Sequence, residues 1–160
     1  MDPWQGIPTV EPPRGMYPSR LDDKGRIKLP VGFQHYLGSL REKTLFVTSL
    51  DRRIAQIYPM ATWRLNEDFF ENYKEDPDAA RKVAFNANDL GSEAEMDSQG
   101  RIVFSPELRR ELGIENQPVK IFAHRGRIEV LSEKIYEERK QEASLGAPEN
   151  VTKLEAAGLK

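Results

Sequence analysis

The strongest constraint on this fold is that one stretch of the chain occurs twice. Residues 21–38 align without a gap with residues 96–113, which lie 75 positions further along. Aspartate, glycine, arginine, isoleucine, leucine and a final glycine recur at equivalent places in both stretches. Self-similarity over such a long period is typical of repeated structural units. We therefore predict two copies of one small module.

The repeated stretch has the features of a turn, a strand and a short helix. In the first copy residues 22–25 indicate a turn, because Gly25 accepts the positive φ that a Cβ would penalise. Residues 26–29 then alternate polar and apolar, as a half-buried strand does. Pro30 is well placed to start a short helix, and Gly38 to stop it. The second copy has the equivalent turn at residues 97–100.

The segments after each short helix are also similar in the two copies. Both read as strand, turn, strand and helix, so each module has four strands and two helices. In the first copy these are strands at 44–48 and 54–58, then helical segments at 59–73 and 79–88. In the second copy the predicted elements are strands at 94–96, 101–104, 119–123 and 128–131, a short helix at 106–113 and a last helix capped by Ser132.

Four short strands form a core too small for a stable isolated module. We therefore predict an α+β fold in which the two copies are interleaved into one small barrel-like core with flanking helices. The predicted parts are a flexible lead-in at 1–13, the first module at 14–64, a helical connector at 65–90, the second module at 91–138 and a C-terminal tail at 139–160. The proline-rich lead-in and the tail after about residue 143 are expected to be loosely ordered.

Composition narrows the class of function. Hydrophobic residues make up 38% and charged residues 31%, as in folded globular chains. No apolar run approaches the ~20 residues of a membrane helix, and the N-terminus lacks the pattern of a signal peptide. We therefore expect no membrane partner. The chain has no cysteine, which excludes disulfides and thiolate metal sites and fits a cytoplasmic location.

Nothing in the sequence indicates catalysis. His35 and His124 stand apart, with no metal-ligand spacing and no acid or nucleophile placed beside them. No activated serine, phosphate-cradling glycine loop or metal cluster is recognisable. We predict a protein that is not an enzyme, with no cofactor, no bound metal and no small-molecule substrate.

Charge is distributed unevenly along the chain although the net charge is only −2. Residues 14–48 contain seven basic and three acidic residues, whereas residues 66–80 contain six acidic and one basic. The local electrostatic field of a surface, and not the net charge of the chain, decides which ligands it attracts. The basic first module is therefore compatible with a nucleic-acid partner. Ordinary solvated charge is the alternative explanation.

The repeated Asp-x-x-Gly-Arg-Ile motif, followed by a short helix, resembles the swapped-hairpin DNA-binding domain of the AbrB/SpoVT superfamily. Two copies joined by a helical segment resemble the MraZ family of bacterial transcriptional regulators. Arg14-Gly15, Tyr58-Pro59 and Trp63 are further points of similarity, and the resemblance spans residues 14–138. It implies a ring-shaped homo-oligomer, cytoplasmic and associated with the nucleoid. Its partner would be double-stranded DNA carrying short direct repeats ahead of a cell-division and cell-wall gene cluster.

The resemblance implies DNA contact for Arg26 and Arg101. The residues alone leave a second role open, an ion pair with Asp22 or Asp97 that holds the turn closed, and the two roles are compatible. A guanidinium at the start of a strand can bridge phosphates or bind guanine through two hydrogen bonds. The remaining predicted DNA-binding residues are Lys24, Arg20, Lys28 and Gln99. The predicted structural residues of the turns are Asp22, Gly25, Asp97 and Gly100.

The two copies depart from each other and from the family. Gln99 replaces Lys24 in the second turn, and Ser105 replaces Pro30, so we expect the first copy to contribute more to DNA binding. The chain also has extra residues before Arg14. A protein-interaction module is the competing hypothesis, because antitoxins of related fold bind partner proteins through a flexible tail. Val151, Leu154 and Leu159 in this tail are spaced for one helical face.

Overall fold

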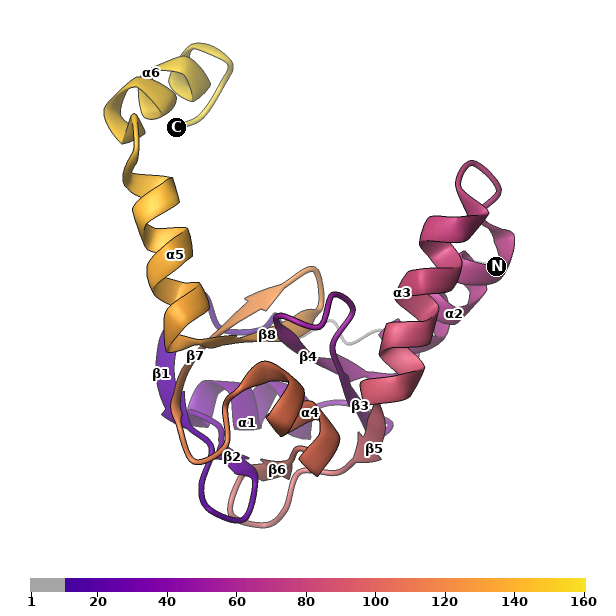
Figure 1. Cartoon of the computed structure of the whole chain (residues 1–160). Helices are drawn as coiled ribbons and strands as arrows, with labels where there is room; N and C mark the ends of the chain where they lie inside the picture. The colour runs from indigo at the N-terminus through magenta and orange to yellow at the C-terminus, as the bar shows by residue number, and fades with distance from the viewer. Residues whose placement is uncertain (1–10) are drawn as a thin grey trace.

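The computed structural model describes residues 11–160, so most of the predicted lead-in lies outside the described residues. The chain is α+β, and nearly all predicted elements are present (Figure 1). The strands are β1 (Tyr17–Arg20), β2 (Arg26–Lys28), β3 (Leu45–Thr48), β4 (Ala55–Pro59), β5 (Ser92–Ala94), β6 (Arg101–Val103), β7 (Pro118–His124) and β8 (Arg127–Ser132). The helices are α1 (Val31–Gly38), α2 (Met60–Asn72), α3 (Pro77–Leu90), α4 (Pro106–Leu112), α5 (Glu133–Ser144) and α6 (Ala147–Ala156).

The strands of the two copies pair with each other, as the size of the core had led us to expect. The main sheet has six strands in the order β1-β7-β8-β4-β3-β5, and β2 and β6 form a separate two-stranded sheet. All pairs are antiparallel. β1, β2, β3 and β4 of the first copy each contact a strand of the second. Neither copy therefore has a complete sheet of its own.

The expectation of a barrel-like core is wrong. The six-stranded sheet is open, because β1 pairs only with β7 and β5 only with β3. β2 and β6 pair with each other and so form a layer separate from this sheet. The core is closed instead by α1 and α4, which lie between this small sheet and the large one (Figure 1).

The core between these layers contains equivalent residues from both copies. Ile27 and Ile102 face each other across the β2–β6 pair and are both fully buried. Phe33 of α1 and Leu108 of α4 are also fully buried in the same cluster. Burial of each such side chain stabilises the fold by about 1.5–3 kcal/mol. The interleaved arrangement is therefore stabilised by contacts that neither copy could make alone.

The position of β5, the start of α3 and the form of the tail differ from the predictions. β5 ends at Ala94 because its register is set by β3, in which Leu45 pairs with Ala94. α3 begins at Pro77, since the Asp76 side chain caps the helix by accepting the backbone N–H of Ala79. The tail is not loosely structured but forms α6, none of whose residues is buried. No helix within residues 11–160 is long and apolar enough to span a membrane.

Candidate nucleic-acid interface

The first turn is closed by a single carboxylate. Asp22 Oδ1 accepts the backbone N–H groups of Lys24 and Arg26, each at 2.9 Å, while the backbone N–H of Gly25 donates to the Asp22 carbonyl at 3.0 Å. Gly25 has a φ of 77°, a conformation that a side chain would strain. Asp22 Oδ2 accepts Nε of Arg26 at 2.8 Å. The carboxylate therefore fixes both the turn and the arginine.

The second turn repeats this geometry. Asp97 Oδ1 accepts the backbone N–H groups of Gln99 and Arg101, each at 2.9 Å, and Oδ2 accepts Nε of Arg101 at 2.8 Å. Gly100 also has a φ of 77°. The side chains of Arg26 and Arg101 are each 25% exposed. The ion pair considered as the alternative role is thus present in both copies, and it leaves each arginine partly exposed.

The two turns lie at opposite ends of one exposed surface. β2 and β6 point Ile27 and Ile102 into the core, so their other residues face outward. On that side Arg26 is opposite Val103, and Lys28 is opposite Arg101. We call this surface the β2–β6 face and define it by Lys24, Arg26, Lys28, Gln99, Arg101 and Val103. Lys24 and Gln99 are exposed in the flanking turns.

Two of the predicted contact residues make other bonds. Nζ of Lys28 donates to the Gln99 carbonyl, which links β2 to the second turn. Arg20 lies outside the β2–β6 face, at the end of β1, where its Nη2 donates to the Asn116 carbonyl at 2.8 Å. The structure therefore brings five of the six predicted contact residues together and leaves Arg20 beside β7.

Two residues that cover the turns were not predicted from the sequence. Gln34 of α1 lies over Gly100, and a Cβ built on Gly100 would stand 2.2 Å from Gln34 Cδ. Arg109 of α4 lies over Gly25, and a Cβ built on Gly25 would stand 2.0 Å from Arg109 Nη1. Each copy's helix thus covers the turn of the other copy. The signal was available in the sequence, because positions 34 and 109 are equivalent in the aligned repeat.

Hydrogen bonding in the turns shifts the ionisation of both aspartates. The backbone N–H of Arg26 lowers the pKa of Asp22, and the guanidinium of Arg26 and the backbone N–H of Lys24 lower it further. The backbone N–H of Arg101, followed by its side chain and the backbone N–H of Gln99, lowers the pKa of Asp97 in the same way. Burial opposes both shifts but does not cancel them.

These lowered pKa values predict a loss of stability in acid. A carboxylate whose pKa is lower in the folded state stabilises that state above its unfolded pKa, about 4, and this stabilisation disappears as pH falls through the folded pKa. The double variant Asp22→Asn/Asp97→Asn should therefore lose less free energy of unfolding than wild type between neutral pH and pH of about 3. Urea titrations at a series of pH values measure this. Asp23→Asn, an exposed change in the same turn, is the control, and a wild-type slope in the double variant would contradict the prediction.

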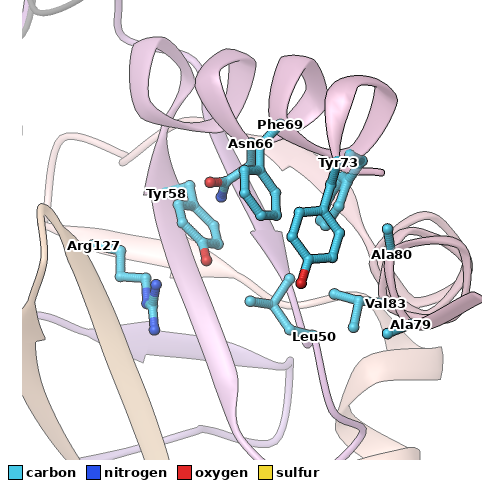
Figure 2. A pocket seen from close by; sticks show the side chains of 10 residues that line it. Leu50, Tyr58, Asn66, Phe69, Tyr73, Ala79, Ala80, Val83 and Arg127 are labelled. Carbon is cyan, nitrogen blue, oxygen red and sulfur yellow. The ribbon is translucent and has the colours of Figure 1, made fainter. Parts of the chain in front are cut away.

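A pocket lies apart from the β2–β6 face, between α2, α3 and the large sheet (Figure 2). Its volume is about 360 Å³ and its walls are mostly apolar. The lining residues are Leu50, Tyr58, Asn66, Phe69, Phe70, Tyr73, Ala79, Ala80, Val83 and Arg127. Arg127 is paired with Glu129 at 3.0 Å, and the lining contains no serine, histidine or carboxylate. These residues do not include a nucleophilic side chain with a general base beside it.

Comparison with known proteins gives a consistent result. A protein of Acidobacterium capsulatum named transcriptional regulator MraZ is 31% identical over 125 residues, which are 78% of this chain and 85% of that protein. The protein of the same name from Koribacter versatilis is 32% identical over 105 residues, 65% of this chain and 71% of its own length. The one from Actinobacillus pleuropneumoniae is 25% identical over 145 residues, 89% of this chain and 95% of its own length. No family model matches the chain.

Proposed function

Because this chain belongs to the MraZ family of transcriptional regulators, we propose that it binds short direct repeats of double-stranded DNA through the β2–β6 face. As a family member it is a DNA-binding regulator of transcription. The proposal adds the surface, the target and the assembly: a ring-shaped homo-oligomer on the promoter of a cell-division and cell-wall gene cluster. The observation that carries it is the pair of arginines, held alike by Asp22 and Asp97 on one exposed surface.

The shape and the donor groups of this surface suit DNA. The major groove admits a two-stranded β-ribbon, and β2 with β6 forms one. The ion pairs engage Nε of Arg26 and Arg101, and within residues 11–160 their Nη groups make no hydrogen bond. Each guanidinium can therefore still offer its outer N–H groups to guanine or phosphate. Lys24 and Lys28 would contact phosphates, which position the protein without reading sequence.

A ring explains how a chain of net charge −2 could bind a polyanion. Each chain offers only a few cations on the β2–β6 face, so one chain alone should bind DNA weakly. Copies joined in a ring engage successive repeats at high effective concentration, which strengthens binding without new contacts. Direct repeats suit a ring. Neighbouring subunits of a ring are related by rotation about one axis, so they present their DNA-binding surfaces in the same direction along the DNA.

The test is binding of the purified chain to DNA from upstream of its own gene, measured at several salt concentrations together with sedimentation. We expect affinity that falls steeply with salt and a stable oligomer at micromolar concentration. Shuffled DNA of the same composition is the control for sequence specificity. A stable monomer would refute the ring, and no binding at low salt would refute the DNA role.

One observation supports a second candidate function. Val151, Leu154 and Leu159 on and after α6 are each about half exposed, so an apolar side of the tail is left partly uncovered by residues 11–160. An antitoxin-like role in binding another protein through this tail is the alternative. If the oligomer is well folded and binds no DNA, deletion of residues 145–160 becomes the next experiment.

A further inference from the structure

The pocket between α2, α3 and the large sheet contains a polar atom whose hydrogen bonding is incomplete. Tyr58 of β4 is 1% exposed, and among residues 11–160 its hydroxyl is the one buried side-chain polar atom without a hydrogen-bond partner. Buried polar groups are normally paired, because an unpaired one costs stability. Burial raises the pKa of this hydroxyl, so it keeps its proton at neutral pH. The pocket therefore holds a hydrogen-bond donor for which the described residues provide no acceptor.

Two further donors line the pocket near this hydroxyl, Asn66 of α2 and Arg127 of β8 (Figure 2). Both partly oppose the rise in the pKa of Tyr58, but neither makes a hydrogen bond to its hydroxyl. Nε and Nη2 of Arg127 both donate to Oε1 of Glu129, at 3.2 and 3.0 Å, and Glu129 is buried. The charge of Arg127 is thus balanced by a carboxylate. The polar end of the pocket therefore suits a neutral hydrogen-bond acceptor better than an anion.

The other end of the pocket is formed by aromatic rings of α2. The rings of Phe69 and Tyr73 are stacked with their centres 5.1 Å apart, and Phe70 meets Phe69 edge-on at 6.2 Å. Such rings pack well against a further ring, either offset and parallel or edge to face. The pocket volume is about 360 Å³. Because an apolar cavity of about 150 Å³ holds benzene, this pocket has room for one aromatic ring with a substituent.

We propose that this pocket binds a small neutral aromatic molecule whose carbonyl-type oxygen accepts a hydrogen bond from the Tyr58 hydroxyl. The ring of the ligand packs against Phe69 and Tyr73, and its oxygen lies toward Tyr58 and Asn66. Phe69 is 56% exposed, so its ring can turn to admit the oxygen to the buried hydroxyl. The ligand is bound and not transformed, since the lining has no nucleophile with a general base. The site is separate from the β2–β6 face, and the inference does not depend on the proposed function.

Acetophenone, one ring with a neutral carbonyl, is the probe for this site. Titration of the full chain, followed by saturation-transfer NMR of the probe, should show saturable binding with a Kd on the order of 1 mM. Tyr58→Phe should weaken binding by about 3- to 10-fold through loss of the donor, and its thermal midpoint should not fall, because an unpaired buried hydroxyl is removed. A hydroxyl that only supports the fold would give the opposite pair of results. Tyr136→Phe loses a hydroxyl outside the pocket and should bind like wild type.

Ala79→Leu tests the location of the site. Ala79 is an exposed residue of α3 that lines the pocket, and only its backbone N–H takes part in the Asp76 cap. A leucine there should fill the pocket and abolish saturable binding, with the thermal midpoint and oligomer size of wild type.

Three results would overturn the inference: no saturable binding to wild type, equal affinity in Tyr58→Phe, or undiminished binding in Ala79→Leu. If wild type binds no acetophenone and Ala79→Leu changes the oligomer size, the pocket is a contact between copies and not a ligand site. These measurements use no DNA, so their outcome is distinct from that of the DNA-binding test.

Discussion

Replacing both Arg26 and Arg101 with alanine should lower the affinity for upstream DNA by about 100-fold, which is about 1.4 kcal/mol for each arginine. Each guanidinium is fixed by its aspartate, so little conformational entropy is lost when its outer N–H groups bind. Removal of the arginine also exposes the negative charge of Asp22 or Asp97 toward the phosphates. The loss should be greater for Arg26→Ala than for Arg101→Ala, because the first turn has Lys24 where the second has Gln99.

The control must remove the same charge elsewhere. Arg53 and Arg64 form ion pairs with Glu138 and Glu42 at 3.0 and 2.7 Å, away from the β2–β6 face. Arg53→Ala/Arg64→Ala therefore has the same net charge as the test variant. Binding by electrophoretic mobility shift and size by sedimentation are measured for both. An equal loss in the two double variants would show that the β2–β6 face has no special role.

Ile27→Ala and Ile102→Ala should each destabilise the whole fold by about 2–5 kcal/mol. Both side chains are fully buried and lie opposite each other where the two copies meet. Because β2 forms its backbone hydrogen bonds with β6, the loss of packing on either strand lowers the stability of both copies. Unfolding should therefore remain one cooperative transition, shifted to lower denaturant by similar amounts in the two variants.

Val103→Ala is the matched control for this prediction. Val103 lies next to Ile102 on β6 but is 52% exposed, so its truncation should change stability by no more than about 0.5 kcal/mol. Urea unfolding followed by circular dichroism, at one fixed protomer concentration, gives the three values. Two separate transitions, with each isoleucine variant affecting only one, would contradict the interleaved core.

Local patterns in the sequence were sufficient to locate most of the elements. The Asp-x-x-Gly turns, the alternation after them and the prolines at the N-termini of α2 and α4 are short-range signals, and the structure has the predicted elements there. The start of α3 was missed although Asp76-Pro77 is a recognisable cap. Helix α6 was not predicted because its amphipathic pattern is weak, and none of its residues is buried in the structure.

Strand partners could not be predicted in the same way. The four-strand module implies a strand before the first turn, but it carries no information that this strand, β1, pairs with β7, about 100 residues away. Arg109 was overlooked for the same reason, because its role depends on a turn in the other copy. The ion pair between Arg26 and Asp22 lies within four residues of sequence and was anticipated. Whether Arg26 and Arg101 contact DNA stays a prediction.

The pairing of β2 with β6 has a consequence for synthesis of the protein. Ile27 leaves the ribosome 75 residues before its partner Ile102. At a translation rate of about 5–20 residues per second, this isoleucine waits roughly 4–15 s for the strand that covers it. During that time the apolar side of the nascent first copy is accessible to chaperones and to neighbouring chains. Because the two copies are interleaved, the first half of the molecule cannot complete its fold until the second half has been synthesised.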